Sequence, residues 1–276
     1  MRLDFTKMHG LGNDFILVDC RDKAVSDRLP AIGELSRRLC HRRFGIGADQ
    51  MLLLYPSKTA DFMMKIFNAD GSEVEMCGNG IRCLAKYIWD RGMSEKDELS
   101  VETAAGIIRP VKAGEMVRVD MGEPVLEAQA IPVNLEGVIK NFPLIIEGKK
   151  FRITCVSMGN PHAVIFVGDV DGFDVKKYGP AIETHELFPN RTNVEFIQTV
   201  GTERLKMRVW ERGAGETMAC GTGASAAAVA ASLNGFTGRK VTVGLLGGEL
   251  SVEWSGDNHV YMTGPAEEVF EGRIEV

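Results

Sequence analysis

Two cysteines in matching glycine-rich stretches are the residues of this chain best placed to do chemistry. Cys77 opens the stretch Cys-Gly-Asn-Gly and Cys220 opens the stretch Cys-Gly-Thr-Gly, and each stretch leads into a run with helical spacing of apolar residues. A thiol at the amino end of a helix lies beside unpaired backbone N–H groups and the positive end of the helix dipole, which favour the thiolate and can also bind a carboxylate. The two thiols are 143 residues apart (220 − 77), about half the chain, and we expect them to face each other in one active site.

Two facing thiols can invert a stereocentre by proton transfer. One thiolate removes the proton from the carbon and the other thiol delivers a proton to the opposite side, so the two act as general base and general acid. The obstacle is the carbanion that forms next to a carboxylate. Backbone N–H groups of the glycine loops can stabilise the charge that builds on the carboxylate oxygens, an effect often worth ~3 kcal/mol per donor.

The two halves of the chain repeat the same order of motifs. This repetition predicts a duplicated fold with the site in the crevice between the halves, a common place for ligands. We place the join between the halves near residue 120, just before the irregular segment 124–143. The matched pairs are Gly12 with Gly159 (offset 147), Asp49 with Asn193 (offset 144), Asn68 with Glu211 (offset 143), Glu73 with Glu216 (offset 143) and Gly92 with Gly235 (offset 143).

Periodicity and turn residues predict a mixture of strands and helices around these motifs. Residues 7–14 resemble a glycine-punctuated loop, and Gly179-Pro180 is expected to interrupt a helix within 174–187. The expected helices are one after Pro30, one from Cys77 to about Gly92, and one over 224–233 that is alanine-rich on all sides and hence buried. The expected strands are 15–19, 51–55, 62–67, short runs within 99–121, then 151–157, 163–167, 194–198, 205–210, 240–243, 249–254 and 260–263, before a tail at 273–276.

Composition excludes several other classes of protein. The chain has 276 residues, 45% of them hydrophobic, a formal charge of −6 and a pI near 5.5, which disfavours a nucleic-acid or membrane-surface partner. The amino terminus lacks a secretory pattern and no apolar run is long enough for a membrane span, so we expect a cytoplasmic protein. None of the six cysteines forms a C-x-x-C pair, so we expect free thiols and no metal site.

Six further motifs carry a family resemblance along the whole chain. They are Lys7-Met8-His9-Gly10-Leu11-Gly12-Asn13-Asp14-Phe15, Asn68-Ala69-Asp70-Gly71-Ser72, Met76-Cys77-Gly78-Asn79-Gly80-Ile81-Arg82-Cys83, Gly159-Asn160-Pro161-His162, Arg191-Thr192-Asn193-Val194-Glu195-Phe196, and Glu211-Arg212-Gly213-Ala214-Gly215-Glu216-Thr217 continuing to Ala219-Cys220-Gly221-Thr222-Gly223. With these motifs in register, the sequence resembles the diaminopimelate epimerase family.

The resemblance implies a cofactor-independent isomerase that interconverts L,L- and meso-2,6-diaminopimelate, a small-molecule substrate on the route to lysine and peptidoglycan. It implies Cys77 and Cys220 as the acid–base pair, with His162 and Glu211 assisting their protonation states. A homodimer is the assembly we expect. The remaining implied substrate-binding residues are Asn13, Gln50, Asn68, Gly78, Asn79, Asn160, Asn193, Arg212, Gly221 and Thr222, with Glu211 binding substrate as well.

The fold implied by the resemblance is an α/β fold of the α+β type. It has two pseudo-symmetric halves, each a curved mixed β-sheet wrapped round a central helix, with the active site in the cleft between them. The last strand returns to the first half, so the expected domains are 1–120 plus about 264–276, and 121–263.

Two alternatives remain open at this point. A related racemase acting on proline-type substrates would use the same pair of thiols. A thiol redox switch would instead join Cys77 and Cys220 in a disulfide and would not catalyse proton exchange. The amino acid that exchanges its α-proton, and the state of the thiols with and without reductant, distinguish these hypotheses.

Overall fold

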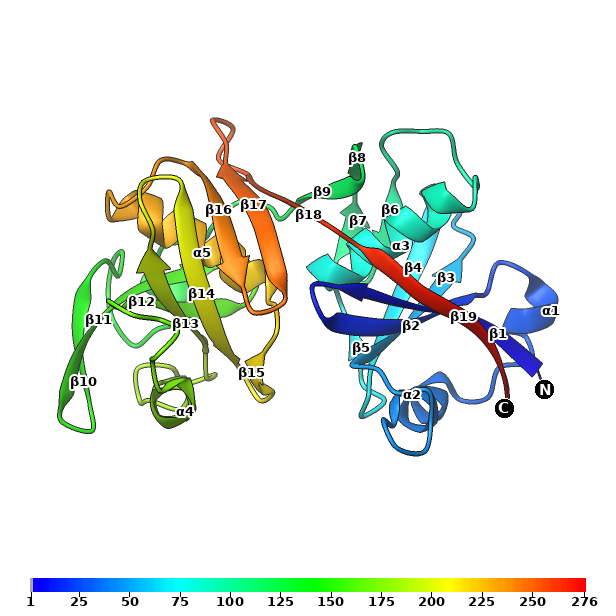
Figure 1. Ribbon diagram of the computed structural model, residues 1–276, viewed down its shortest axis with the longest axis horizontal. Helices are drawn as coiled ribbons and strands as arrows, with labels where there is room; N and C mark the ends of the chain where they lie inside the picture. The colour runs from blue at the N-terminus through cyan, green and yellow to red at the C-terminus, as the bar shows by residue number, and fades with distance from the viewer. Residues whose placement is uncertain (1) are drawn as a thin grey trace. The chain divides into compact units, whose positions relative to one another are not determined.

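Each half of the chain folds around its own β-sheet in the computed structural model, which describes residues 2–276 (Figure 1). Unit 1 consists of Met1–Val119 and Gly264–Val276, and unit 2 consists of Asp120–Thr263. The chain therefore passes between the units twice. The predicted class, an α+β fold with two pseudo-symmetric halves and mixed sheets, is confirmed.

The sheet of unit 1 has the strand order β19-β1-β2-β3-β4-β6-β7, and β5 pairs with β4. All pairs are antiparallel except β2 with β3 and β4 with β6, which are parallel. The strands are β1 (Arg2–Gly10), β2 (Asn13–Asp19), β3 (Gln50–Tyr55), β4 (Phe62–Asn68), β5 (Glu73–Val74), β6 (Val101–Thr103), β7 (Gly106–Ile108) and β19 (Glu267–Glu275), and a hairpin of β8 (Val111–Ala113) and β9 (Met116–Asp120) follows β7. The helices are α1 (Lys23–Ser26), α2 (Ile32–Cys40) and α3 (Gly78–Asp90).

The sheet of unit 2 contains the order β10-β11-β12-β13-β14-β16-β17-β18, and β15 pairs with β14. Here β12 with β13 and β14 with β16 are the parallel pairs. The strands are β10 (Phe142–Ile146), β11 (Lys149–Ser157), β12 (Pro161–Phe166), β13 (Asn193–Thr199), β14 (Arg204–Glu211), β15 (Gly215–Thr217), β16 (Lys240–Leu245), β17 (Gly248–Trp254) and β18 (Val260–Gly264). The helices are the 3-10 turn η1 (Ala128–Ala130), α4 (Val175–Glu183) and α5 (Gly221–Leu233).

The two sheets repeat one another strand for strand. The run β1 to β4 corresponds to the run β11 to β14, with the same parallel second pair, and α3 corresponds to α5. The register corrects one predicted match. In the parallel pairs Phe15 lies opposite Gln50 and His162 lies opposite Asn193, so the partner of Asn193 is Gln50 (193 − 50 = 143) and not Asp49.

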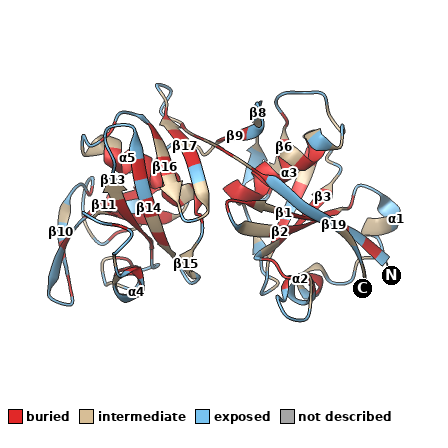
Figure 2. Ribbon diagram, viewed as in Figure 1, coloured by how far each residue is buried: buried red, intermediate tan, exposed pale blue. Residues whose placement is uncertain are grey.

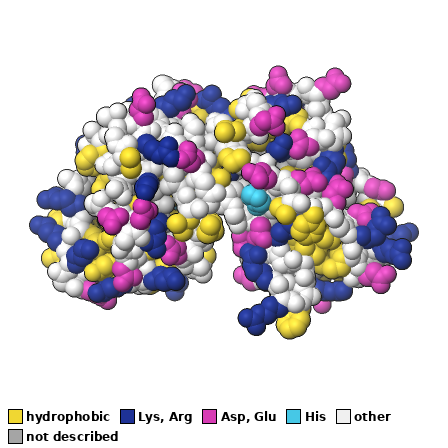
Figure 3. Space-filling model, in the orientation of Figure 1, with side chains coloured by type: hydrophobic (Ala, Val, Ile, Leu, Met, Phe, Trp, Pro, Cys, Tyr) yellow, Lys and Arg dark blue, Asp and Glu magenta, His cyan; other side chains and the backbone are white. Residues whose placement is uncertain are grey.

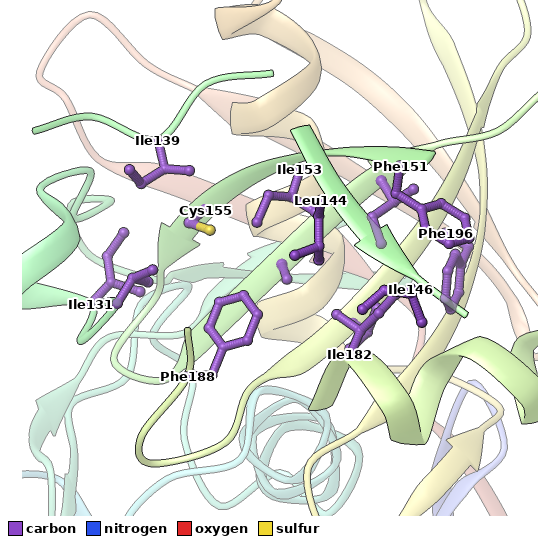
Figure 4. Packing of buried hydrophobic residues seen from close by; sticks show 14 of the residues in the cluster. Ile131, Ile139, Leu144, Ile146, Phe151, Ile153, Cys155, Ile182, Phe188 and Phe196 are labelled. Atoms are coloured by element: carbon purple, nitrogen blue, oxygen red, sulfur yellow. The ribbon is translucent and has the colours of Figure 1, made fainter. Parts of the chain in front are cut away.

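Each sheet is covered on both faces. Because successive residues of a strand point to opposite sides, one strand contacts both covering layers. In β3, Met51 and Leu53 pack with Leu35 and Leu39 of α2. Leu52 between them points to the other face, where α3 lies. Unit 2 repeats the arrangement, and Figure 4 shows its α4-side cluster, which includes Ile146, Phe151, Ile182, Phe188 and Phe196.

The two corresponding helices are buried to the same extent, with ten of the thirteen residues buried in each. In α3 only Asp90 is exposed, and Lys86 and Trp89 are half-buried. None of the residues of α5 is exposed, and the visible part of its ribbon in Figure 2 is red or tan, because its alanines present no bulk and the helix packs closely against the sheet. The predicted burial of the alanine-rich helix is confirmed, although the helix begins at Gly221, three residues before the predicted start.

The segment 7–14 was wrongly predicted to be a loop. β1 continues to Gly10 and β2 begins at Asn13, so only Leu11 and Gly12 form the turn. Both have positive φ, 58° and 84°, as a two-residue type I′ hairpin requires. Strand pairing with β2 on one side and β19 on the other supplied the hydrogen bonds that overrode the glycine signal.

Two further predictions of secondary structure were wrong. α4 continues through Pro180 to Glu183, and Gly179 serves packing, since a Cβ there would lie 2.6 Å from the ring of Trp210. Residues 273–275, predicted from local pattern as part of a tail, belong to β19, which pairs antiparallel with β1 over Arg2 to His9 (Figure 1), as the last strand implied by the family resemblance does.

A charged cluster fixes the loop that precedes β3. Asp14 accepts hydrogen bonds from Lys7 (2.6 Å) and Arg42 (2.8 and 3.0 Å), and Arg42 also bonds Asp49 (2.6 Å). Burial acts to raise the pKa of Asp14, but the hydrogen bonds from Arg42 and Lys7 outweigh it and hold that pKa well below its usual range. The carboxylate is therefore ionised throughout the physiological pH range.

Acidic and basic side chains are interspersed over the face of each unit in Figure 3. Within residues 2–276, no helix has the length and apolar character needed to cross a bilayer. In the same part of the chain, no group of three or more His, Cys, Asp or Glu side chains is placed to hold a metal ion.

Candidate active site

Cys77 is the N-cap residue of α3. Its backbone is extended (φ −139°, ψ 116°), and its sulfur accepts a hydrogen bond from the N–H of Gly80 at 3.4 Å. The side chain is partly exposed. The predicted position of this thiol, at the positive end of a helix with the first-turn N–H groups beside it, is confirmed.

A chain of hydrogen bonds connects Cys77 to the polar side chains around it. The Sγ of Cys77 donates to Asn13 Oδ1 at 3.7 Å, and Asn79 Nδ2 donates to the same oxygen at 3.2 Å. Asn13 Nδ2 in turn donates to Asp49 Oδ2 at 2.9 Å. The structure thus brings together three predicted site residues, from β2 and from the first turn of α3.

Arg82, one turn into α3, supports this arrangement from beneath. Its guanidinium is fully buried and donates to Asn79 Oδ1 (2.9 Å), to the Gly78 carbonyl (3.2 Å) and to the Pro265 carbonyl (3.1 Å). Sequence reasoning did not single out Arg82, although it lies in a quoted motif. An arginine in the buried stripe of a helix was the signal, because such a group is buried only when its donors are satisfied.

Gln50 and Asn68 form a second pair in unit 1, where β3 begins and β4 ends. They lie opposite each other in the antiparallel pair, and Gln50 Nε2 donates to Asn68 Oδ1 at 2.9 Å. Asn68 also donates to the hydroxyl of Ser72 at 3.0 Å, within the Asp-Gly turn. Gln50 Oε1 is buried and has no hydrogen-bond partner among residues 2–276, so it retains acceptor capacity for a bound group.

Cys220 is the N-cap residue of α5 and repeats the geometry of Cys77. Its backbone is extended (φ −125°, ψ 114°), and its sulfur accepts from the N–H of Gly223 at 3.4 Å and lies 3.4 Å from the hydroxyl of Thr222. Only 6% of Cys220 is exposed. Burial, followed by the charges of Glu211 and Glu195, raises the pKa of the Cys220 thiol well above its ordinary value.

Glu211 ends β14 and lies beside Cys220. Its carboxylate accepts a hydrogen bond from Thr217 at 2.5 Å. Burial raises the pKa of Glu211, while its hydrogen bonds with Thr217 and Cys220 act in the opposite direction. The predicted proximity of this carboxyl to one of the thiols is therefore part of the structure, and it places an acceptor next to the sulfur.

His162, at the start of β12, is fully buried with both ring nitrogens engaged. Nδ1 lies 2.7 Å from Glu195 Oε1, and Nε2 lies 2.8 Å from Asn160 Oδ1. The family resemblance implies that His162 assists the protonation states of the thiols, and in the structure its ring nitrogens contact a carboxylate and an amide. Its influence on Glu211 is through charge.

Asn193 and Arg212 are joined through the backbone. Asn193 Oδ1 accepts from the Arg212 N–H at 2.9 Å, and Asn193 Nδ2 donates to the Pro161 carbonyl at 2.9 Å. The Arg212 guanidinium is exposed and donates to the Asn190 carbonyl at 3.3 Å. The structure therefore brings Arg212 next to Asn193 by its main chain, and leaves the guanidinium with donors for a carboxylate.

Glu183 anchors the loop that carries Glu211 and Arg212. Its buried carboxylate accepts from the indole N–H of Trp210 (2.7 Å) and from the Gly213 N–H (2.9 Å). No local pattern indicated this role, because Glu183 lies in a helix 28 residues before Glu211 (211 − 183) and resembles an ordinary helical acid.

Glu195 is a third residue, after Arg82 and Glu183, that the sequence did not indicate. It is 0% exposed, lies in the middle of β13, and its Oε1 would be 2.8 Å from a Cβ at Gly223. It thus lies directly beneath the first turn of α5. A comparison of repeat positions was the available signal, since the corresponding residue of the first half is Leu52 (195 − 52 = 143).

The arrangement within each unit is suited to binding and protonating a small zwitterion. Each unit presents a thiol with helix N-terminal N–H groups that can stabilise a carboxylate, and amides that can both donate and accept. All six cysteines are free thiols.

Comparison with known proteins places these features in one family. A family model described as diaminopimelate epimerase matches residues 5–127 and 154–269. The diaminopimelate epimerase of Moorella thermoacetica is 58% identical over 277 residues, covering 98% of this chain and 98% of that protein. Among solved structures, a Bacillus anthracis phenazine biosynthesis protein of the PhzF family has a TM-score of 0.73 at 18% identity, with both chains covered in full. A hydroxyproline epimerase from Agrobacterium vitis has a TM-score of 0.65 at 16% identity, covering 99% of this chain and 91% of the other. The likeness to these two structures is one of fold.

Proposed function

The chain belongs to the diaminopimelate epimerase family and is an isomerase, and we propose that it interconverts L,L- and meso-2,6-diaminopimelate without a cofactor. The family resemblance predicted from the motifs is confirmed by this membership. The reaction supplies a precursor of lysine and peptidoglycan. The alternatives of a proline-type racemase and a redox switch are not favoured by the family match.

The proposed reaction is a proton transfer between two sulfurs and one carbon. A thiolate takes the α-proton and its bond pair remains on the carbon, delocalised into the carboxylate. The second thiol then donates its proton to the opposite face, which inverts the centre and leaves that sulfur as the thiolate. Because the pKa of Cys220 is raised well above its ordinary value, Cys220 is a thiol at neutral pH and is equipped to donate.

Helix N-termini are proposed to stabilise the charge that develops on the carboxylate. The first residues of α3 and α5 (Gly78 and Asn79, Gly221 and Thr222) carry N–H groups that an α-helix leaves without intrahelical partners. Their alignment with the helix dipole favours an anion, and the stabilisation is greatest when the oxygens carry most charge.

The remaining predicted residues are proposed to bind the amino and carboxylate groups of the substrate. Glu211 supplies negative charge for an ammonium, and the exposed Arg212 guanidinium can bind a carboxylate with two parallel bonds. The amides are Asn13, Gln50, Asn68, Asn160 and Asn193, and His162 is proposed to act through the residues it contacts.

One observation carries the proposal. In a chain that belongs to an epimerase family, Cys77 and Cys220 occupy the same N-cap position of corresponding helices, each with its sulfur 3.4 Å from the N–H three residues later. Helix capping by itself favours Ser, Thr, Asp or Asn, since sulfur is a weak acceptor. Two cysteines at these positions support a role in proton transfer.

Exchange of the α-proton tests the proposal directly. In D₂O the wild type is expected to incorporate deuterium at the α-carbon of both isomers of diaminopimelate while interconverting them, with no pyridoxal phosphate added. Epimerisation by Cys77→Ala and by Cys220→Ala is expected to fall by at least ~10²-fold, the usual contribution of a general acid or base.

Two other buried cysteines provide matched controls, Cys83→Ala in unit 1 and Cys155→Ala in unit 2. Both are expected to retain exchange. Epimerisation at near wild-type rates in both Cys77→Ala and Cys220→Ala, with folding verified by circular dichroism, rejects the two-thiol mechanism. Exchange of proline but not diaminopimelate by the wild type rejects the substrate.

The assembly and location stay predictions. We propose a homodimer, which light scattering coupled to size-exclusion chromatography measures as twice the 30.2 kDa chain mass. A cytoplasmic location follows from the proposed pathway and is checked by fractionation of the source cells.

A further inference from the structure

A buried polar pair lies beneath α5 at a position where the corresponding helix of unit 1 covers apolar side chains. His162 and Glu195 are both 0% exposed and lie 2.7 Å apart. The register of the parallel strands equates them with Phe15 (162 − 15 = 147) and Leu52 (195 − 52 = 143), which are also 0% exposed.

Contacts made by the helix glycines confirm this equivalence in space. A Cβ at Gly80 of α3 would meet Leu52 at 3.2 Å and Phe15 at 3.5 Å, whereas a Cβ at Gly223 of α5 would meet Glu195 at 2.8 Å. Packing beneath such a helix is therefore satisfied by two apolar residues. Burying a carboxyl and an imidazole in their place carries a desolvation cost, so the pair calls for an explanation other than packing.

The hydrogen bonds of His162 determine how many protons the pair holds. Nδ1 faces the Glu195 carboxyl and Nε2 faces the carbonyl oxygen of the Asn160 amide, so both ring nitrogens have an acceptor. If Glu195 is ionised, His162 carries a proton on each nitrogen. If Glu195 is protonated, its proton bonds to Nδ1 and the ring still carries one on Nε2. Both descriptions contain the same protons and differ only in which side of the 2.7 Å bond holds one.

The surroundings of the second carboxyl oxygen of Glu195 support a net charge of zero for the His162–Glu195 pair. Glu195 Oε2 is buried and has no hydrogen-bond partner among residues 2–276. A Glu195 carboxylate beside a neutral His162 would be a buried negative charge without a positive partner, since His162 is the only ion-pair partner of Glu195 among residues 2–276. In either arrangement, Nε2 is a donor and the Asn160 oxygen accepts.

The proton on His162 Nε2 determines the orientation of the Asn160 amide. With Oδ1 held by His162, the amide NH₂ is the end that remains to bind a ligand, and it donates to no residue within 2–276 in the structure. Its counterpart Asn13 is held differently, because Asn13 Oδ1 accepts from Asn79 and Asn13 Nδ2 donates to Asp49. Of the two corresponding asparagines, Asn160 is the one with its donor end unused.

We infer that Glu195 is a positioning residue which, through His162, fixes the amide of Asn160 so that it presents N–H donors to a carboxylate of the substrate. The inference rests on the proposed function for the identity of the substrate. The direct contacts on which it depends, from Glu195 to His162 and from His162 to Asn160, are within unit 2. Cys220, Glu211 and Cys155 are the other titratable groups on which the charge of Glu195 acts.

Nitrogen-15 NMR of the histidine rings tests the proton arrangement without any substrate. In the ¹⁵N-histidine-labelled wild type at neutral pH, Nε2 of His162 is expected to be protonated, with the resonance assigned by its loss in His162→Phe. In Glu195→Leu the ring loses its Nδ1 partner, and a mixture of the two neutral tautomers is expected. An unprotonated Nε2 in the wild type, or an unchanged ring in Glu195→Leu, overturns the inference.

Kinetics of the double variant His162→Phe/Glu195→Leu test the consequence for binding. This variant copies the apolar pair of unit 1 and is expected to fold, as checked by circular dichroism. KM for diaminopimelate is expected to rise about tenfold, equivalent to the loss of one hydrogen bond to a charged group. An unchanged KM overturns the inference, whatever happens to kcat.

The two failures are distinguishable. If the wild type exchanges no α-proton of diaminopimelate, the proposed function fails. The NMR comparison still decides whether Glu195 fixes the proton on His162 Nε2, because it needs no substrate.

Discussion

Gly223→Ala and Gly80→Ala form a matched pair that tests the packing beneath the two thiol-bearing helices. Both glycines are the third residue of their helix, and their N–H groups bond Cys220 and Cys77 respectively. Alanine keeps the N–H and differs from glycine only by the added Cβ. Each methyl group lies at a similar distance from the N-cap cysteine of its helix (3.3 Å in α5, 3.4 Å in α3), so the two variants differ mainly in the contact with the layer below.

The distances predict opposite outcomes. Ordinary contact begins near 3.4 Å, so a Cβ at Gly223 and the Glu195 carboxylate must move apart by about 0.6 Å (3.4 − 2.8). That carboxylate is fully buried and bonded to His162, so it cannot move freely. A Cβ at Gly80 and the flexible end of the Leu52 side chain need to move apart by only about 0.2 Å (3.4 − 3.2).

The free energies follow from these displacements. Overpacking a buried site costs roughly 1–3 kcal/mol, and replacing glycine by alanine within a helix returns up to about 1 kcal/mol. We expect Gly223→Ala to be destabilised by about 1–2 kcal/mol. We expect Gly80→Ala to be neutral or stabilised by a few tenths of a kcal/mol, since the free energy gained in helix propensity exceeds the cost of the small displacement.

Hydrogen exchange measured by mass spectrometry resolves the two helices separately. Peptides from α5 should exchange about tenfold faster in Gly223→Ala than in the wild type, while α3 peptides in Gly80→Ala should not. Gly168→Ala is the control, because a Cβ there would have no neighbour within 4 Å. If α5 of Gly223→Ala is protected as well as in the wild type, the close approach of Glu195 to the helix is refuted.

Three further predictions concern charge and packing elsewhere. Asp14→Asn removes the carboxylate that pairs with the buried Lys7 and one of the two carboxylates that Arg42 binds, and should lower the urea-unfolding free energy by about 2 kcal/mol at neutral pH. Because the folded pKa of Asp14 is depressed, this difference should be complete above about pH 5 and be lost progressively below about pH 4, and a difference that shrinks between pH 7 and pH 5 contradicts it. Glu211→Gln removes a charge that raises the pKa of Cys220, so iodoacetamide should alkylate Cys220 faster at neutral pH; an unchanged rate, followed by peptide mass spectrometry, argues against that charge effect. Gly179→Ala forces a methyl group against the Trp210 ring and should cost about 2 kcal/mol in urea unfolding, whereas wild-type stability would show that α4 can move away.

Local chemistry made most of the framework predictable from sequence. The glycine-rich stretches after Cys77 and Cys220 predicted two helix starts, and both cysteines are the N-caps of those helices. Helical spacing and β-prone runs depend on neighbours within a few residues, so the strands 15–19, 51–55 and 62–67 were predicted to within one or two residues. The repeat offset predicted two similar halves.

Strand pairing limited what the sequence could predict. The segment 7–14 has loop-forming glycines, yet most of it is strand, because β2 and β19 offer hydrogen-bond partners on both sides. The strand β19 itself pairs with a segment more than 250 residues away, from Arg2 with Glu275 to His9 with Glu267. No local pattern contains that information.

The sequence by itself determined which residues are proposed to carry the chemistry: two cysteines with glycine loops, a histidine, and a set of amides and charged groups in motifs. The tertiary structure alone decided how those groups are oriented. Glu195 resembles an ordinary strand residue until β12 lies beside β13 and α5 covers both, which brings it 2.7 Å from His162, 33 residues away in sequence. The physical reason is that backbone preferences act between near neighbours, whereas the proton and amide orientation of a buried side chain depend on the few atoms that packing places around it.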